Sequence, residues 1–160
     1  MLRLITIMIK VNVLSEDKSW SKRLNEKEKL FNKVCKLFPD KFKFNNKKVF
    51  LTVLLSNNKR IKILNKKFRN KNKHTDILSF PFEQKTKKHK EIYLGDIIIS
   101  FDYINKPKNQ DNKEFRTKTI KIFIHGFLHL IGFDHVKIKD YKKMFDYEKK
   151  IFKSVEKLIN

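Results

Sequence analysis

The sequence predicts an α+β fold, a single domain over residues 1–160 in which a four-stranded mixed sheet packs against helices. Three observations support this fold class. Four segments rich in β-branched and aromatic residues have the length of strands. Four longer segments repeat their apolar residues at helical spacing. The chain is long enough for one hydrophobic core and contains no internal repeat or linker.

The first half of the chain predicts two strands separated by a long helix. Residues 2–13 alternate in polarity and are rich in Ile and Val, so they predict a strand. Ser15 or Asp17 could cap a helix over 18–38, which ends before Pro39. A second strand is predicted over Lys48–Leu55. The apolar stripe of the helix consists of Trp20, Leu24, Phe31, Val34 and Phe38.

A short helix is expected after Ser56, with Ile61, Leu64 and Phe68 directed inward and Arg69 near its end. Two further strands follow this helix. They are predicted over Thr75–Phe82 and Glu91–Ser100, with a lysine-rich loop between them, 83–90.

The last third of the chain predicts two long helices. Residues 105–112 contain Pro107 and several polar side chains, which is typical of a connector. A helix over about 111–131 carries the main motif of the chain, and we expect it to be central in the domain. Helix 138–159 then completes the fold.

The charge balance favours an anionic partner. The formal net charge is +22 at pH 7, and the basic residues are mostly lysine. The chain has no alanine, so a bias toward AT-rich codons explains part of this composition. Such a bias also tolerates Glu, yet only 17 residues are acidic. The remaining positive excess favours a nucleic acid, although a solvated lysine surface is an equally good interpretation.

Cysteine and hydropathy patterns favour a soluble, cytoplasmic protein with no membrane partner. Cys35 is the single cysteine, which excludes a disulfide framework and a zinc ribbon, and its helical setting predicts a buried thiol. The apolar run from Leu4 to Ile9 is too short for a signal peptide and is interrupted by Lys10.

The segment HGFLHLIGFDH, residues 125–135, predicts a metal site. His125 and His129 are four residues apart, so they project from one face of a helix. Gly132 can end that helix in a left-handed conformation, and the turn can bring His135 to the same point. Three imidazoles are the protein ligands of a catalytic zinc site, which keeps a fourth position for water.

A buried, hydrogen-bonded core histidine is the alternative interpretation. The run 122–133 has no formal charge and should be buried. Each unpaired imidazole there would cost about 1–3 kcal/mol. One metal ion satisfies all three imidazoles, so the metal site is the better explanation, with Zn²⁺ as the expected ion and one ion per chain.

The spacing of the three histidines is also that of the metzincin proteases, whose motif has a Glu directly after the first His as general base. Gly126 occupies this position, so a peptidase of that mechanism is not expected. Gly126, Gly132 and Gly95 are the three glycines of the chain. Gly95 indicates a bulge or a close backbone approach within its strand.

Residues 125–135 resemble the H-G-x-L-H-L-x-G-[YF]-D-H signature of the YbeY family, bacterial rRNA maturation factors and single-strand endoribonucleases. The segment LNKKFR, 64–69, resembles the family's L-N-x-x-[YF]-R. TDILSFP, 75–81, resembles its T-D-V-L-S-F-P, and LGDI, 94–97, its L-G-D-I. Met144 and Glu148 also fall at matching positions, so the ordered blocks run from about 64 to 148.

The resemblance implies the same α+β architecture. It also matches Arg69 to the arginine in the family's active-site cleft. Arg69 and His125 are therefore the two candidate catalytic residues. A planar, always-charged guanidinium suits a phosphodiester, although a helix-end Arg on the surface is the alternative.

Five further residues are candidates for the surroundings of the metal or for contact with substrate. Asp134 could orient an imidazole or cap the turn after Gly132. Glu148 could pair with a ligand His or a basic residue, although a merely partly exposed carboxylate is favoured. The others, which could equally form the turn that opens a strand or contact substrate, are Thr75, Asp76 and Ser79.

The function predicted is a zinc-dependent endoribonuclease for single-stranded RNA, acting in 16S rRNA 3′-end maturation and small-subunit quality control. The reaction, the substrate and the partners, which are rRNA, the small ribosomal subunit and its assembly factors, follow from the resemblance. Two alternatives remain open. One is a non-catalytic, metal-stabilised ribosome assembly factor that binds rRNA. The other is a metallohydrolase of peptide or small substrates.

Overall fold

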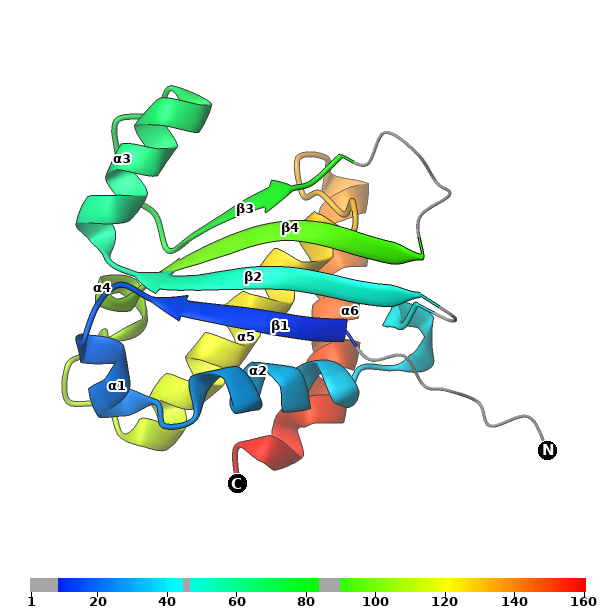
Figure 1. Ribbon diagram of the computed structural model, residues 1–160, viewed down its shortest axis with the longest axis horizontal. Helices are drawn as coiled ribbons and strands as arrows, with labels where there is room; N and C mark the ends of the chain where they lie inside the picture. Colours follow the sequence, from blue (N-terminus) through cyan, green and yellow to red (C-terminus); the bar gives the residue numbers. More distant parts are fainter. Residues whose placement is uncertain (1–8, 45–46, 84–89) are drawn as a thin grey trace.

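The computed structural model describes residues 9–44, 47–83 and 90–160 and contains the expected four-stranded mixed sheet (Figure 1). The strand order is β1-β2-β4-β3, so β1 and β3 are the edge strands. β1, β2 and β4 are parallel, and β3 is antiparallel to β4. The strands are β1 Ile9–Ser15, β2 Lys48–Ser56, β3 Ile77–Pro81 and β4 Glu91–Ser100.

Helices cover one face of this sheet fully and the other in part. In Figure 1, α5 and α6 cross behind the sheet, and α2 runs beside β1. α3 lies at one end of the opposite face. The helices are α1 Ser19–Arg23, α2 Lys27–Lys36, α3 Asn58–Arg69, α4 Phe101–Ile104, α5 Asn112–Leu130 and α6 Ile138–Val155, with 3₁₀ turns η1 Asp40–Phe42 and η2 Glu156–Leu158.

One large apolar core holds α1, α2, α5 and α6 against the sheet. Phenylalanine supplies much of its volume: Phe31 packs on Phe123, and Phe38 packs on Phe127, with ring centroids 4.9 and 4.8 Å apart. Cys35 is buried in this core, as predicted. The α+β prediction is therefore confirmed. No helix in the described residues is long and apolar enough to cross a membrane.

The single helix predicted over 18–38 is wrong, because the chain forms two helices with a break at Leu24–Glu26. Glu26 adopts a left-handed φ of 45° there. The indole of Trp20 anchors α1 by donating to the Ser56 carbonyl at 2.9 Å. α2 is held separately against β1, where the Asn32 amide bonds the backbone of Val11. With α4 added, the described chain has six α-helices rather than four.

Other boundaries differ by smaller amounts. The first strand continues to Ser15, while residues 2–8 of its predicted span lie outside the described residues. β3 is shorter than the predicted 75–82. The inward orientation predicted for Phe68 is wrong: this ring is 59% exposed, whereas Ile61 on the same helix is fully buried.

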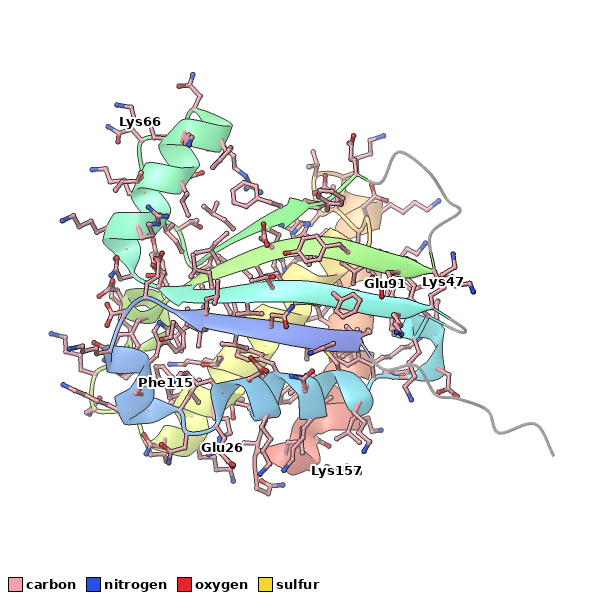
Figure 2. The ribbon with its side chains drawn as sticks, in the orientation of Figure 1. Glu26, Lys47, Lys66, Glu91, Phe115 and Lys157 are labelled. Atoms are coloured by element: carbon pink, nitrogen blue, oxygen red, sulfur yellow. The ribbon has the colours of Figure 1, made fainter. Side chains whose placement is uncertain are left out.

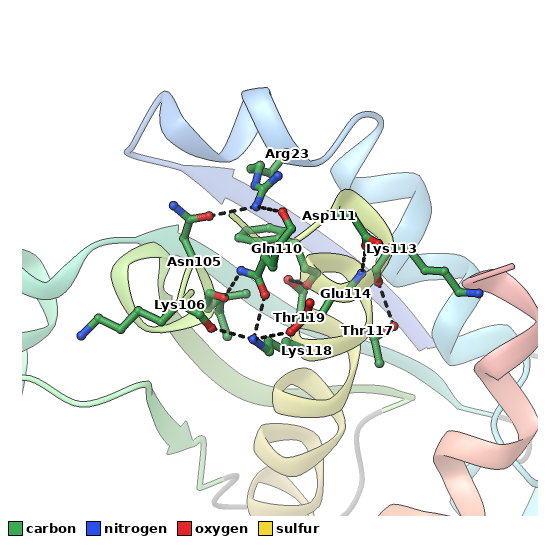
Figure 3. A network of polar contacts seen from close by, with 12 residues as sticks. Arg23, Asn105, Lys106, Gln110, Asp111, Lys113, Glu114, Thr117, Lys118 and Thr119 are labelled. Carbon is green, nitrogen blue, oxygen red and sulfur yellow. Dashed lines mark hydrogen bonds and ion pairs between the residues drawn. The ribbon is translucent and has the colours of Figure 1, made fainter. Parts of the chain in front are cut away.

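A polar network fixes the connector that leads into α5 (Figure 3). The Arg23 guanidinium donates to the Gln110 carbonyl at 2.8 Å and to the Asn105 side chain at 3.2 Å. The Lys118 ammonium donates to the Gln110 side chain and to the Lys106 carbonyl, at 2.7 and 2.6 Å. These bonds tie α1, the connector and the first turns of α5 together, and so hold the helix that carries the histidines.

Candidate metal centre and cleft

Three imidazoles converge at the end of α5. His125 and His129 lie one turn apart on the helix, and their Nε2 atoms are 3.1 Å from one another. His135 joins them after the turn, with ring centroids 5.4 Å from His125 and 5.0 Å from His129. One nitrogen of each ring lies within 4.8 Å of the others, so the three-His group could hold a metal ion.

The turn that delivers His135 depends on Gly132. This glycine has a φ of +99°, which other residues rarely adopt. Its N–H donates to the His129 carbonyl at 3.1 Å, and the Phe133 N–H donates to the Leu128 carbonyl at 3.0 Å. This pair of bonds is a Schellman motif. The predicted helix stop at Gly132 is therefore confirmed.

Glu148 on α6 reaches the first histidine. Its Oε1 lies 2.5 Å from His125 Nδ1, and both side chains are partly buried. The carboxylate was expected to be merely partly exposed, but it also pairs with a histidine of the group. Because Glu148 occupies Nδ1, the Nε2 of His125 is the nitrogen directed toward His129. A carboxylate behind a ligand imidazole fixes the tautomer and orientation that metal binding requires.

The environment favours the neutral form of His129. Burial lowers the pKa of this imidazole, and the positive charges that His125 and His135 can carry lower it further. A hydrogen bond with the backbone of Phe133 opposes the shift in part. A neutral imidazole has a free lone pair, so this pKa shift suits a metal ligand.

Gly126 points away from the histidines and toward the sheet. A Cβ built at this position would lie 2.7 Å from Ile77 Cδ1 and 3.1 Å from two side-chain atoms of Ile97. The residue that supplies the general base in metzincins would therefore point into β3 and β4 rather than into the cleft. This geometry strengthens the sequence argument against a peptidase of that mechanism.

The three-His group opens into a cleft of about 640 Å³ between the end of α5 and the edge strand β3. The cleft brings together candidates that are far apart in the sequence. Arg69 comes from the end of α3, and Asp134 from the turn after α5. Thr75, Asp76 and Ser79 come from β3 and the residues just before it. Of the predicted site residues, only Glu148 does not line this cleft.

A family model described as "Endoribonuclease YbeY" matches residues 12–156 of the chain. The chain belongs to the YbeY family. The protein named "Endoribonuclease YbeY" from Pelagibacter ubique (strain HTCC1062) is 57% identical over 149 residues, which cover 93% of this chain and 97% of the relative. The protein of the same name from Mycoplasma capricolum is 30% identical and covers 91% of this chain and 88% of its own length.

A solved structure agrees with the YbeY assignment. The solution structure of TM1509 from Thermotoga maritima superimposes with a TM-score of 0.54 at 27% sequence identity. The match covers 91% of this chain and 88% of that one. The similarity therefore extends over most of both chains.

Arg69 lines the cleft of this YbeY-family chain together with the three histidines. Its Nη2 donates to the Ser79 carbonyl at 3.2 Å, and its guanidinium carbon lies 5.8 Å from the centre of the Phe80 ring. These contacts hold the guanidinium against the edge strand. Because they use one nitrogen and one face of the group, other N–H donors remain for a ligand in the cleft.

The remaining candidates divide into turn formers and one free hydroxyl. The Asp76 carboxylate accepts from the Thr75 hydroxyl and the Ile77 N–H at 3.0 and 2.8 Å, so it forms the turn that opens β3. The Asp134 carboxylate accepts from the His135 N–H at 2.7 Å, which is its turn-capping role. By contrast, Ser79 Oγ is buried in the cleft wall with no hydrogen-bond partner in the described residues.

One charged residue that lines the cleft was not predicted from the sequence. Lys71 lines the cleft beside Arg69, but nothing distinguishes it from the many other lysines of the chain. For Glu148 the sequence left a ligand histidine or a basic residue open as the partner. The crossing of α5 and α6 selects His125, 23 positions away.

Proposed function

We propose that this chain is a zinc-dependent endoribonuclease that cuts single-stranded RNA in the cleft described above. The main observation that supports this proposal is that the three-His group and Arg69 line one open cleft. We propose one Zn²⁺ per chain, held by the three imidazoles, because a neutral tri-histidine set with an open fourth position is typical of catalytic zinc. Family membership supports the reaction class.

The side chains in and behind the cleft would have different roles in catalysis. His125, His129 and His135 hold the ion, and Glu148 orients His125 through its Nδ1. Zinc in such a site supplies a water of lowered pKa and a Lewis acid for a phosphoryl oxygen. Arg69 would bind the phosphodiester and stabilise the negative charge that grows on it.

Ser79 would add a neutral contact. Ser79 lines the cleft, and its buried hydroxyl lacks a partner in the described residues, so we keep this residue as a candidate for substrate contact. Thr75, Asp76 and Asp134 line the same cleft, and their side chains hold the turns that shape it.

We further propose that the substrate is rRNA, that the step is 16S 3′-end maturation and small-subunit quality control in the cytoplasm, and that the partners are the small ribosomal subunit and its assembly factors. The names of the relatives support the endoribonuclease activity. The net charge of +22 supports an RNA partner. If phosphates are bound, the logarithm of affinity should fall linearly with the logarithm of salt concentration, and a flat dependence would contradict this proposal.

Single-turnover cleavage of a single-stranded RNA tests the activity. The parent should cleave in proportion to its zinc content, which elemental analysis should place near one ion per chain. His125→Ala and His129→Ala should lose both zinc and cleavage, because two remaining ligands bind the ion far more weakly. His74→Ala is the matched control, since His74 is exposed and outside the three-His group. If zinc-free His125→Ala cleaved as fast as the parent, the nuclease proposal would fail and the assembly-factor alternative would replace it.

A further inference from the structure

The face of the sheet opposite the main core is covered only at one end. There, Ile61 of α3 packs on Leu78 and Ile98. No helix of the described chain covers the rest of this face. Five aromatic side chains lie on it or at its border, and we call them the aromatic face: Phe50, Phe68, Phe80, Phe82 and Tyr93.

Contacts join four of these rings into two pairs. Phe68 packs on Phe80 with ring centroids 5.3 Å apart, and Phe82 packs on Tyr93 at 5.6 Å. Phe50 is the β2 partner of Tyr93 in the sheet register. Val49 and Leu51 belong to the core on the other side, so the alternation of the strand places Phe50 here. Phe68 and Phe82 are 59% and 58% exposed, so their rings are accessible.

Two cations lie beside these rings. The Lys67 ammonium lies 5.2 Å from the centre of the Phe68 ring, and the Arg69 guanidinium lies 5.8 Å from that of Phe80. Two acidic side chains of the described residues on this face have partners. Asp96 accepts from the Tyr93 hydroxyl at 2.5 Å, and Glu91 pairs with Lys48 at 4.0 Å. Figure 2 views this side of the molecule, with Glu91 labelled at the start of β4 and Lys66 on α3.

The aromatic face and the cleft are the two sides of one edge strand. Ser79 and Pro81 of β3 line the cleft, whereas Phe80, between them, packs against Phe68. Arg69 contacts both sides, because it donates to the Ser79 carbonyl while its guanidinium lies over Phe80. A chain that lies in the cleft can therefore cross β3 onto the aromatic face.

We propose that the aromatic face stacks bases of single-stranded RNA that extends from the cleft over β3. This inference rests on the proposed function for the class of ligand and adds a second binding site. Exposed rings with cations beside them on an open sheet are the features by which single-stranded nucleic acids are bound, the rings stacking on bases and the cations contacting phosphates. A protein partner would require only apolar area and would not need the cations.

Equilibrium binding of a labelled single-stranded RNA to the zinc-loaded chain tests this site, with a gel confirming that the RNA is intact. The oligonucleotide should have about 12 nucleotides, enough to occupy more than the cleft. Phe82→Leu keeps the apolar side chain but removes the π-face, so we expect about 5- to 50-fold weaker binding. Phe82→Tyr keeps the ring and should bind like the parent.

Phe145→Leu is the matched control. Phe145 is 43% exposed on α6 and has the Lys149 ammonium 4.4 Å from its ring centre. It is therefore an exposed ring beside a cation, as in the aromatic face, but on a different part of the surface. Phe145→Leu should bind RNA like the parent. Equal losses for Phe145→Leu and Phe82→Leu would mean that the rings act without a defined site, and would overturn the proposal.

RNA with abasic positions separates stacking from other effects. If Phe82 stacks on a base, the parent should bind an oligonucleotide that lacks the bases along one half more weakly than the intact oligonucleotide. Phe82→Leu should bind the two oligonucleotides equally. Parent-like binding by Phe82→Leu would overturn the inference and would indicate an apolar surface for a protein instead. Cleavage of a trinucleotide that fills only the cleft is measured in parallel. If that cleavage persists while Phe82→Leu has no effect on binding, the inference about the aromatic face is wrong and the proposed endoribonuclease function still holds.

Discussion

Glu148 Oε1 lies 2.5 Å from His125 Nδ1, so a carboxylate on α6 sets the orientation of a histidine on α5. This contact couples the packing of the two longest helices to the geometry of the three-His group. It also leaves His125 Nε2 directed toward His129. The geometry of the three-His group therefore depends on a residue that does not line the cleft.

Glu148→Gln should weaken zinc binding by about 10- to 100-fold, because the neutral amide orients the imidazole less firmly and makes it a weaker electron donor. The measurement is a competition titration with a chromophoric zinc chelator. Asp146→Asn is the matched control, since Asp146 is exposed on the same helix and is not part of the three-His group. Parent-like zinc affinity in Glu148→Gln would show that the contact is not used in metal binding.

Gly95→Ala should destabilise the sheet next to the cleft. Gly95 has a φ of +134°, and a Cβ there would lie 2.1 Å from the Phe80 carbonyl oxygen of the paired strand β3. We expect a loss of about 2–4 kcal/mol in the free energy of unfolding, measured by denaturant titration. Gly132→Ala is the comparison: it has the strained φ but no atom within 4 Å of the added Cβ, so it should lose only about 1 kcal/mol. Equal losses would mean that the contact with β3 is unimportant.

The parts of the fold that the sequence predicts are those governed by local patterns. The strands β2 and β4, the helix α5 and the helix stop at Gly132 follow from periodicity and glycine chemistry. The convergence of the three histidines follows from the same local rules, because all three lie within 11 residues. The bulge expected at Gly95 is also present: Leu94 and Gly95 together oppose the single residue Leu51 of β2.

The features that the sequence did not predict depend on contacts between distant segments. The break at Glu26 accompanies the separate anchoring of Trp20 to Ser56 and of Asn32 to β1. Phe68 has helical spacing suited to a core position, but α3 covers only the end of the sheet, so the ring remains exposed. No periodic pattern contains such information.

The Cys35 thiol should be inert in the folded protein. Complete burial raises its pKa, because an apolar surrounding disfavours the thiolate. The thiolate is the reactive form, so alkylation at pH 8 should be at least about 100-fold slower in the folded than in the unfolded chain. Mass spectrometry of the iodoacetamide adduct, with and without guanidinium chloride, measures this ratio. Rapid labelling of the native chain would mean that α2 separates easily from the core.

Arg69→Lys tests the role of the cleft cation, because it keeps the positive charge and removes the planar fork. If the guanidinium stabilises charge on the reacting phosphate, single-turnover cleavage should slow by about 10- to 1000-fold. Zinc content and thermal stability should change little, since Arg69 is exposed and is not part of the three-His group. Arg60→Lys is the matched control on the same helix, where Arg60 pairs with Glu16 at 3.6 Å, and it should cleave like the parent. Unchanged cleavage by Arg69→Lys would show that a point charge is sufficient there and that the planar guanidinium is not required.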